Sequence, residues 1–444
     1  MEVCTVGGYE EVGKNMTAVK VGEDVVIFDA GFHLPSVIEL QENEVFQQYT
    51  ERKLRNAGAI PNDLILDKLG WRDKVKAIVI GHAHLDHIGA IPYISHRYPK
   101  ATIMASPFTM AVIDSILEDD KINIKNVKKT VQDNSIHKIS KDMKVEFIHV
   151  THSTIQCFFI ALHTKDGIFF YGLDFKFDNY PTMGNPPNYK RMKELSKKGV
   201  KVLVADALYS GTEKKPGGEA IAKHLLEEAF SKARGKDKAL FVTTFSSHIE
   251  RLKNIVEFAQ KTNRQIIFLG RSLNKYVNSA ISVGKCPFKN KVKLIKYRRQ
   301  INSFLARIEK ERGKYLVVCT GHQAEKGSIL DRIVKGETPF KFRQGDNLIF
   351  SSSVIPVQPN QMLRERLDKK LRNMGVKLQT NVHVHGHGSR EDLRDLIELV
   401  KPEHVIPAHG SLEQETPFIE LASEFGYKFG ETSHLSSNGK VLKF

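Results

Sequence analysis

The sequence has few cysteines and no apolar run long enough to cross a membrane. Cys4, Cys157, Cys286 and Cys319 lie far apart and form no CxxC pair. Their spacing argues against a disulfide framework or a thiolate zinc site and fits a reducing cytoplasm, so any metal would need His and carboxylate ligands. A membrane-spanning helix needs roughly 20 apolar residues, and the N-terminus lacks the basic and apolar regions of a signal peptide. We therefore expect a cytoplasmic protein that does not enter a membrane.

Acidic residues are outnumbered by basic ones. Lys and Arg total 67 against 51 Asp and Glu, a formal net charge of +16. Such an excess is typical of proteins that bind polyanions, because neutralising phosphates releases counterions. Basic residues that only aid solubility would produce the same excess, so charge alone leaves nucleic-acid binding open. Residues 285–299 carry Lys or Arg at seven positions and no acid, which predicts either a solvated face or a wall that guides RNA.

The pattern of predicted strands and helices changes near residue 200. Before about residue 185, short strands separated by turns often end in His or Asp. After residue 200, strands alternate with amphipathic helices, as in a parallel doubly wound sheet. Beyond Gly375, histidines again follow strands. We therefore predict that an α/β domain of residues 208–377 is inserted into a domain made of residues 1–207 and 378–444. The predicted strands are 25–28, 76–80, 147–150, 168–172, 200–205, 239–244, 265–269, 291–296, 315–320 and 347–352, and the predicted helices are 88–96, 219–232, 248–261, 301–312, 361–374 and 390–400.

Four metal-ligand side chains occur within the six residues His82-Ala83-His84-Leu85-Asp86-His87. Residues i and i+2 of an extended strand point the same way, so His82 and His84 can share one ion. Asp86 and His87 lie past the turn and can serve a second ion. Imidazole and carboxylate ligands suit catalytic zinc, or manganese where carboxylates are numerous. The alternative is a polar turn with satisfied histidines, against which four ligand types in six residues argue.

A two-ion site needs further ligands, and later strand ends supply candidates. His152, Asp174 and His409 each follow a predicted strand. A single His in such a place is more often structural, but the shared placement of the three residues favours convergence on one site. Asp174 is the natural bridge because a carboxylate has two oxygens to share. The sequence therefore predicts a two-metal hydrolase.

At these residues the chain resembles a known family. The HxHxDH cluster, with Asp29 before it and His152, Asp174 and His409 after it, is similar to the metallo-β-lactamase fold. The segment between Asp206 and His387 resembles the β-CASP subgroup, which acts on nucleic acids, and together these motifs are most similar to ribonuclease J over essentially the whole chain. Further matching motifs are Thr244-Phe245-Ser246-Ser247-His248-Ile249-Glu250-Arg251, Gly270-Arg271-Ser272, Phe350-Ser351-Ser352-Ser353-Val354-Ile355-Pro356 and Gly386-His387-Gly388.

Three departures from the bacterial pattern point to an archaeal type of this family. The first β-CASP acid, Asp206, is followed by Ala-Leu-Tyr rather than Ser-Thr-Asn. Gly321-His322-Gln323 stands where bacterial members have Gly-Ser-Gln. The chain ends at Phe444, without the C-terminal extension of many bacterial members. These differences leave end preference and dimerisation open.

The resemblance implies an αββα metallo-β-lactamase sandwich with an inserted parallel-sheet α/β β-CASP domain. It also implies two divalent ions per chain, zinc or manganese. One ion would be held by His82, His84, His152 and Asp174, and the other by Asp86, His87, Asp174 and His409. Asp29 would orient a ligand by hydrogen bond. Asp206 and His387 would form a carboxylate–imidazole pair that, with Asp86, takes part in catalysis. A phosphate pocket would comprise Ser351, Ser352, Ser353, His385 and Ser389, although the serine run could equally be a polar strand end.

The implied activity is a 5′→3′ exoribonuclease acting on single-stranded RNA with a 5′-monophosphate, in RNA decay or processing. The implied assembly is a homodimer, with other RNA-decay proteins as candidate partners. An endoribonuclease of the 3′-end processing type is an alternative, disfavoured because the catalytic fold starts at residue 1. A DNA nuclease of the same group is a weaker one, given His409. A small-ester hydrolase would not need a basic insertion, and a non-enzymatic subunit would not keep every ligand position.

Overall fold

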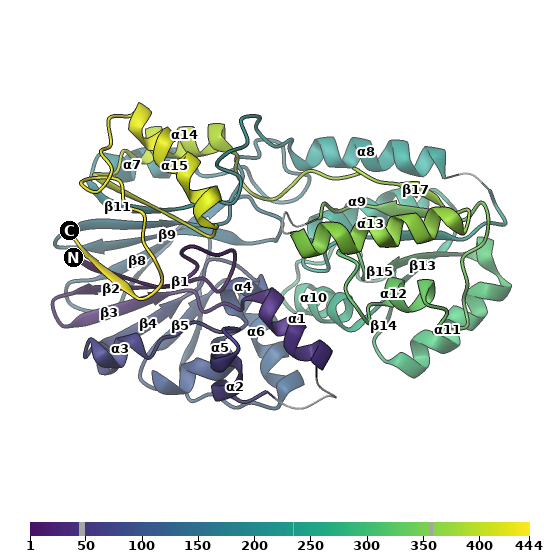
Figure 1. Ribbon diagram of the computed structural model, residues 1–444, viewed down its shortest axis with the longest axis horizontal. Helices are drawn as coiled ribbons and strands as arrows, with labels where there is room; N and C mark the ends of the chain where they lie inside the picture. The colour runs from purple at the N-terminus through teal and green to yellow at the C-terminus, as the bar shows by residue number, and fades with distance from the viewer. Residues whose placement is uncertain (44–48, 234, 355–357) are drawn as a thin grey trace. The chain divides into compact units, whose positions relative to one another are not determined.

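The computed structural model describes residues 1–43, 49–233, 235–354 and 358–444 (Figure 1). These residues form two compact units. Unit 1 comprises Met1–Asn179, Asn185–Pro216 and Gly386–Phe444, and unit 2 comprises Tyr180–Gly184 and Gly217–His385. The chain thus leaves unit 1 and returns to it. The boundaries of the long inserted segment lie at 216/217 and 385/386, whereas the sequence predicts them at 207/208 and 377/378. None of the helices in the described residues is long and apolar enough to cross a membrane.

Unit 1 contains two mixed sheets. The first has the order β19-β1-β2-β3-β4-β5-β6, in which β3 to β6 run parallel. Its strands are β1 (Glu2–Gly7), β2 (Met16–Val21), β3 (Asp24–Phe28), β4 (Val75–Val79), β5 (Thr102–Ala105), β6 (Lys128–Thr130) and β19 (Lys440–Lys443). The second has the order β18-β11-β10-β9-β8-β7. Its strands are β7 (Ser135–Lys138), β8 (Lys144–Val150), β9 (Cys157–Thr164), β10 (Gly167–Gly172), β11 (Val200–Asp206) and β18 (His404–Ala408). β11, which begins the strand–helix alternation in the sequence, therefore belongs to unit 1.

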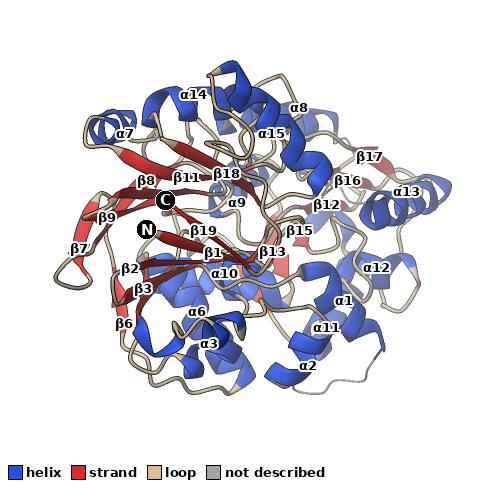
Figure 2. Ribbon diagram, turned by 60° about the vertical axis from the view of Figure 1, so that its left-hand side comes forward, coloured by secondary structure: helices blue, strands red, loops and turns tan. Residues whose placement is uncertain are grey.

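The alternation of side chains along these strands builds a sandwich. Phe28 of β3 contacts Phe169 of β10 with ring centroids 5.0 Å apart, so the two sheets pack face to face. The neighbouring Phe170 points the other way and contacts Phe159, with centroids 5.4 Å apart. This outer face is covered by α7 (Tyr189–Ser196), α14 (Arg390–Val400) and α15 (Leu412–Glu424), as Figure 2 shows. α6 (Pro107–Asp120) contacts β5 and β6 of the other sheet. The result is the expected αββα arrangement.

The parallel strands bring their carboxyl ends to the same edge of each sheet. In the second sheet β10, β11 and β18 are parallel, and β8 runs with them because β9 is antiparallel to both β8 and β10. Asp29 and His409 directly follow a strand, and Asp174 comes one residue after the residue that follows β10. Their φ angles are positive, at 57° for Asp29, 46° for Asp174 and 59° for His409. Left-handed backbone is uncommon for residues with a Cβ and is tolerated best by Asn, Asp and His. These sharp turns place the three side chains at the strand ends.

Close packing also constrains the turn after β3. A Cβ on Gly31 would lie 1.6 Å from the carbonyl oxygen of Asp86. Only glycine lets the two backbone segments approach this closely. The loop after β3 is thereby held against the segment that carries Asp86 and His87.

Unit 2 is built on one parallel sheet of the order β14-β13-β15-β12-β16-β17. Its strands are β12 (Leu240–Thr243), β13 (Gln265–Leu269), β14 (Lys293–Ile295), β15 (Tyr315–Cys319), β16 (Asn347–Phe350) and β17 (Lys377–Gln379). Their apolar runs are buried, as in sheets covered on both faces. The helices of unit 2 are α8 (Glu219–Lys232), α9 (Ile249–Gln260), α10 (Arg271–Ser282), α11 (Arg298–Lys310), α12 (Ile329–Val334) and α13 (Gln358–Asn373).

Some predicted elements differ in extent. The helical stretch expected at 88–96 is three short pieces: the first ends at Ile88 before Gly89, and the second begins at Ile91 with Pro92 in its first turn. The strand expected at 291–296 is limited to Lys293–Ile295, and α11 begins earlier than expected, at Arg298. The remaining helices of unit 1 are α1 (Leu34–Asn43), α2 (Glu51–Asn56), α3 (Ile65–Lys68), α4 (Leu85–Ile88) and α5 (Ile91–Ile94), with short 3₁₀ turns at Arg72–Lys74 and Ser95–Arg97.

Candidate active site

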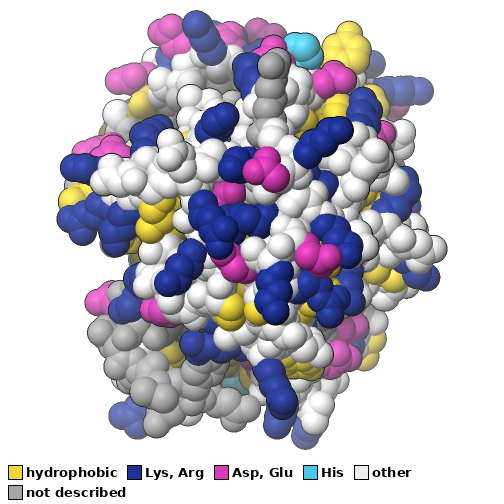
Figure 3. Space-filling view, turned by 90° about the vertical axis from the view of Figure 1, so that its right-hand side faces the viewer, with side chains coloured by type: hydrophobic (Ala, Val, Ile, Leu, Met, Phe, Trp, Pro, Cys, Tyr) yellow, Lys and Arg dark blue, Asp and Glu magenta, His cyan; other side chains and the backbone are white. Residues whose placement is uncertain are grey.

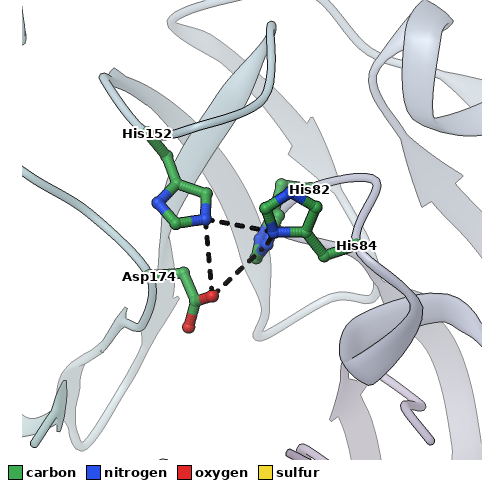
Figure 4. A group of neighbouring side chains, drawn as sticks. All are labelled: His82, His84, His152 and Asp174. Atoms are coloured by element: carbon green, nitrogen blue, oxygen red, sulfur yellow. Dashed lines mark hydrogen bonds and ion pairs between the residues drawn. The ribbon is translucent and has the colours of Figure 1, made fainter. Parts of the chain in front are cut away.

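Four ligand-type side chains converge at strand ends of unit 1. His82 and His84 follow β4, His152 follows β8 and Asp174 follows β10. His84 Nδ1 lies 3.1 Å from His82 Nε2 and 3.1 Å from His152 Nε2, and Asp174 Oδ2 lies 3.4 Å from His82 Nε2. One ligand atom from each residue lies within 4.8 Å of the others. Figure 4 shows the four side chains pointing toward a common centre, so His82 and His84 face the same way.

Burial keeps these imidazoles neutral. It lowers the pKa of His84 to about 4, and it is the main reason that the pKa values of His82 and His152 lie well below their ordinary value. Burial by itself would raise the pKa of Asp174, but nearby histidines, His409 first, lower it well below its ordinary value. Neutral imidazole and ionised carboxylate are the forms that bind a metal. The ring nitrogens gathered here are therefore in the form that can bind a metal at neutral pH.

A buried hydrogen bond orients His87. Its Nδ1–H donates to Asp29 Oδ2 at 2.6 Å, while Asp29 Oδ1 accepts from the Gly81 N–H at 2.9 Å. His87 Nε2 then faces Asp174 Oδ2 at 3.2 Å and Asp86 Oδ2 at 3.7 Å. Burial by itself lowers the pKa of His87, but these carboxylates outweigh it and raise the pKa well above its ordinary value. The same negative field favours a cation at Nε2.

The second group comprises Asp86, His87 and His409, whose ligand atoms lie within 4.8 Å of one another. His409 Nε2 lies 3.8 Å from Asp86 Oδ2 and 3.8 Å from Asp174 Oδ1. Asp174 Oδ1 is buried and has no hydrogen-bond partner in the described part of the chain. A buried carboxylate oxygen without a donor is costly unless a cation binds it. The donors of both groups therefore fit divalent cations, with Asp174 between the groups.

Asn15 belongs to the site and was missed in the sequence. Its side chain is 1% exposed, and Nδ2 lies 2.9 Å from His409 Nδ1 and 3.1 Å from His87 Nε2. Nδ2 also donates to the carbonyl oxygen of Asp86 at 3.1 Å. The residues beside Asn15 are not ligand types, and no local spacing marks it. Only the fold, which lays the turn before β2 against the other two segments, reveals it.

Asp206 and His387 form a hydrogen-bonded pair. His387 Nδ1 donates to Asp206 Oδ2 at 2.7 Å, and Asp206 Oδ1 accepts from the Leu208 N–H at 2.9 Å. The His387 ring stacks on that of His409, with centroids 5.5 Å apart. Burial by itself lowers the pKa of His387, but Asp206 and then Asp174 raise it to about 9. A protonated imidazole therefore lies beside the ligand groups, and the structure brings together the pair expected from the sequence.

In unit 2 a buried arginine holds the first serine of the expected phosphate pocket. Arg251 of α9 is fully buried and pairs with Glu219 through Nε and Nη2. Its Nη1 donates to Ser351 O and Oγ, each at 3.1 Å, and lies 3.0 Å from His383 Nδ1. Ser351 Oγ donates in turn to the Val382 carbonyl at 3.0 Å. The hydroxyl of Ser351 is therefore already engaged within the protein.

The other expected phosphate-binding residues differ in their surroundings. Ser352 is 3% exposed, and its hydroxyl has no hydrogen-bond partner among the described residues. Ser353 and His385 are half-buried in the same unit. Ser389 is buried in unit 1, where it is the N-cap of α14. Its N–H donates to Asp392 Oδ2 at 3.1 Å. Within the serine run, the hydroxyl of Ser351 is therefore engaged, whereas that of Ser352 is able to take a new partner.

Family comparisons cover most of the chain. The metallo-beta-lactamase superfamily matches residues 9–169, and the beta-CASP domain of ribonuclease J matches residues 237–366. A domain described as the RNA specificity domain of Zn-dependent metallo-hydrolases matches residues 373–430. A crystal structure of a protein of unknown function from Enterococcus faecalis V583 has a similar fold, with a TM-score of 0.63, 17% identity and 99% of both chains covered.

Named relatives agree with these matches. Ribonuclease J of Pyrococcus abyssi is 39% identical over all of this chain and 97% of its own length. Ribonuclease J of Methanocaldococcus jannaschii is 37% identical over all of this chain and 99% of its own length, and that of Synechocystis is 28% identical over all of this chain and 65% of its own. The fold and the archaeal type expected from the sequence are thereby confirmed. The chain belongs to the ribonuclease J family and is a metal-dependent ribonuclease of the metallo-β-lactamase fold.

Proposed function

We propose that this protein is a 5′→3′ exoribonuclease that hydrolyses single-stranded RNA and favours a 5′-monophosphate end. The observation that carries the hydrolytic chemistry is the convergence of two ligand groups on Asp174 with the His387–Asp206 pair beside them. RNA as the substrate is supported by the names of the relatives and by the RNA specificity domain. The direction of degradation rests on the family resemblance.

Two divalent ions, zinc or manganese, fit the donor set of unit 1. When bound, such a pair supplies hydroxide at neutral pH and neutralises the charge that develops on phosphorus. The proposed ligands are His82, His84, His152 and Asp174 for one ion and Asp86, His87, Asp174 and His409 for the other.

The neighbouring groups orient these ligands. Asp29 holds the tautomer of His87, and Asn15 contacts His409 Nδ1. His152 Nδ1 donates to the Gly386 carbonyl at 2.6 Å, which turns Nε2 toward the other ligands. Hydrogen bonds of this kind fix both the ring orientation and the basicity of the metal-facing nitrogen.

His387 is the proposed general acid. Its Nδ1 is bonded to Asp206, and Asp206 favours the protonated ring. The proton goes to the departing 3′-oxygen, so the alkoxide leaves as an alcohol and the 5′-phosphate stays on the remaining chain. Positioned proton transfer of this kind contributes typically 10²–10⁴-fold to a rate.

The 5′-end preference requires a group that binds the terminal phosphate. The hydroxyl of Ser352 is the strongest candidate of the proposed set, which also contains Ser351, Ser353, His385 and Ser389. We further expect a homodimer, which light scattering coupled to size-exclusion chromatography would detect.

End-labelled RNA tests the proposal. The purified protein is incubated with zinc or manganese and a single-stranded RNA that carries a 5′-monophosphate, a 5′-triphosphate or a 5′-hydroxyl. Stepwise release of mononucleotides, fastest from the monophosphate, is the expected result. Internal fragments that do not depend on the 5′ end would assign the protein to the endonuclease alternative, and cleavage of DNA but not RNA would exclude both.

A further inference from the structure

One long stretch of unit 2 has no acidic residue. Residues 258–308 contain 12 Lys or Arg and neither Asp nor Glu. The stretch spans β13, α10, β14 and most of α11. Because β14 is the edge strand of its sheet, the segments around it lie at the border of the unit. Positive charge is therefore concentrated there rather than mixed with acids as elsewhere.

Five exposed basic residues of this stretch lie on or next to β14 and α11, and we call them the basic ridge. Lys293 Nζ lies 4.6 Å from the ring centroid of Phe304, and the Arg307 guanidinium lies 5.2 Å from the same ring. Figure 3 views the side on which α11 is drawn in Figure 1, and Lys and Arg dominate the charged groups there. The basic ridge comprises Lys291, Lys293, Arg298, Arg299 and Arg307, and the buried Arg332 lies next to it through Asn302 of α11.

Neighbouring acids do not neutralise the ridge. In the described residues none of its members lies within ion-pair distance of a carboxylate. Glu309, on the same helix, pairs with Arg312 and Arg343, and Asp331 pairs with Lys335. The ridge therefore presents uncompensated positive charge to solvent.

Two placements of basic residues, one on the ridge and one next to it, oppose the stability of the fold. Arg298 and Arg299 occupy the first turn of α11, where no acid is present and the helix dipole disfavours cations. Arg332 is 7% exposed, donates to Asn302 Oδ1 at 3.1 Å, and its Nε has no partner among the described residues. Burial and then Arg298 lower the pKa of Arg332. Such an arrangement becomes favourable when an anion binds.

An exposed aromatic ring completes the surface. Tyr297, directly before Arg298, is 61% exposed, and Lys296 Nζ lies 5.8 Å from its ring centroid. Rings beside basic residues are the usual platform for unpaired bases, since every base has a face that can stack. Insertion into a membrane would need further apolar side chains, whereas Tyr297 is the only large apolar side chain that is exposed between residues 258 and 308.

We propose that the basic ridge binds the phosphate backbone of single-stranded RNA and that Tyr297 stacks on one of its bases. The inference rests on the proposed ribonuclease function and adds a binding surface to it. The segment 285–299, with its seven basic residues, would then be part of an RNA-binding surface rather than a merely solvated face.

Charge removal on the ridge tests the proposal. The ridge variant combines Lys291→Gln, Lys293→Gln, Arg298→Gln and Arg299→Gln. The control variant removes the same charge from exposed positions of α13, where acids are interspersed, with Arg366→Gln, Lys369→Gln, Lys370→Gln and Arg372→Gln. KM and kcat are measured for a 30-nucleotide single-stranded RNA at several salt concentrations. Hydrolysis of bis(p-nitrophenyl) phosphate and the thermal midpoint report the active site and the fold.

The expected result is a selective loss of RNA affinity. At 0.15 M salt the ridge variant should raise KM for RNA at least about tenfold with kcat and the small ester unchanged. The slope of log(1/KM) against log salt should fall in magnitude by up to about 3, since each single-strand phosphate contact contributes about 0.7. Tyr297→Ala should raise KM about fivefold or more without changing that slope.

Three outcomes would overturn the inference. Equal KM values for the ridge and control variants, with a wild type that cleaves the RNA, would refute the ridge and leave the proposed function standing. A ridge variant that loses binding to phosphatidylserine vesicles but keeps its KM for RNA would assign the surface to a membrane. A wild type that hydrolyses the small ester but not RNA would instead refute the proposed function.

Discussion

Replacing Asp29 by Asn would test how the hydrogen bond beneath the site controls metal binding. The two carboxylate oxygens of Asp29 accept from two donors, the Nδ1–H of His87 at 2.6 Å and the N–H of Gly81 at 2.9 Å. Asparagine has nearly the same shape but only one oxygen. One of the two donors must therefore face an amide NH₂.

Either arrangement weakens the site. If the new NH₂ faces Gly81, a buried donor is left unpaired at a cost of about 1–3 kcal/mol. If it faces His87, the ring must accept at Nδ1, and its proton moves to Nε2, the nitrogen that points at Asp86 and Asp174. Loss of such a partner typically costs 10–100-fold in metal affinity, equivalent to about 1.4–2.7 kcal/mol. We expect Asp29→Asn to lose affinity at the ion bound by His87.

Zinc titration against a competing chelator, with metal content measured after dialysis, provides the assay. Asp24→Asn is the matched control, because Asp24 begins the strand that Asp29 follows, is partly exposed and pairs with Lys76 at the surface. The control should bind zinc like the wild type. Wild-type affinity and two retained ions in Asp29→Asn would refute the role assigned to this hydrogen bond.

Three further changes have distinct expected results. His387→Ala should lower kcat for RNA by about 10²–10⁴-fold while metal content stays unchanged; an equal loss of metal would instead make His387 a ligand. Burial by itself raises the pKa of Glu146, but His163 and Arg191 lower it to about 2 from 4.5, so the stability it supplies above pH 4.5 is lost as the pH falls toward 2. The thermal midpoint of Glu146→Gln should therefore approach that of the wild type between pH 5 and 3, and a constant gap would contradict the assignment. Phe159→Ala should destabilise unit 1 by about 3–5 kcal/mol in chemical denaturation, because its ring is fully buried between β9 and the covering helices, and a loss below about 1 kcal/mol would count against that packing.

Local patterns were enough to predict most of the elements. β13 and α8 have the predicted bounds, because an apolar run flanked by polar residues and an amphipathic repeat are local properties. The prediction of one helical stretch after His87 was less accurate, since this segment, which contains Gly89 and Pro92, forms short separate pieces. β14 is shorter than predicted. The alternation of polar and apolar residues continues beyond it, but an edge strand has a neighbour on one side only, so the flanking residues have no second strand with which to pair.

The ligand cluster at His82–His87 could be recognised in the sequence because its residues are adjacent. Asn15 could not, since a single Asn is recognisable only when the turn before β2 is folded against His409. Ser351 illustrates the same limit, because its hydroxyl is committed to Val382 and Arg251 by contacts that no spacing reveals.

By itself, the sequence determined the family, the fold class and the identity of the ligand-type residues, because short motifs and periodicity depend only on residues that are close together in the chain. Only the tertiary structure decided which atoms meet. Parallel strands end at one edge, so side chains more than 300 residues apart, such as His82 and His409, are gathered around Asp174. The same holds for the acid-free stretch. It forms a basic surface because β14 lies at the edge of the sheet and the arginines of α11 lie beside it, which the sequence alone does not show.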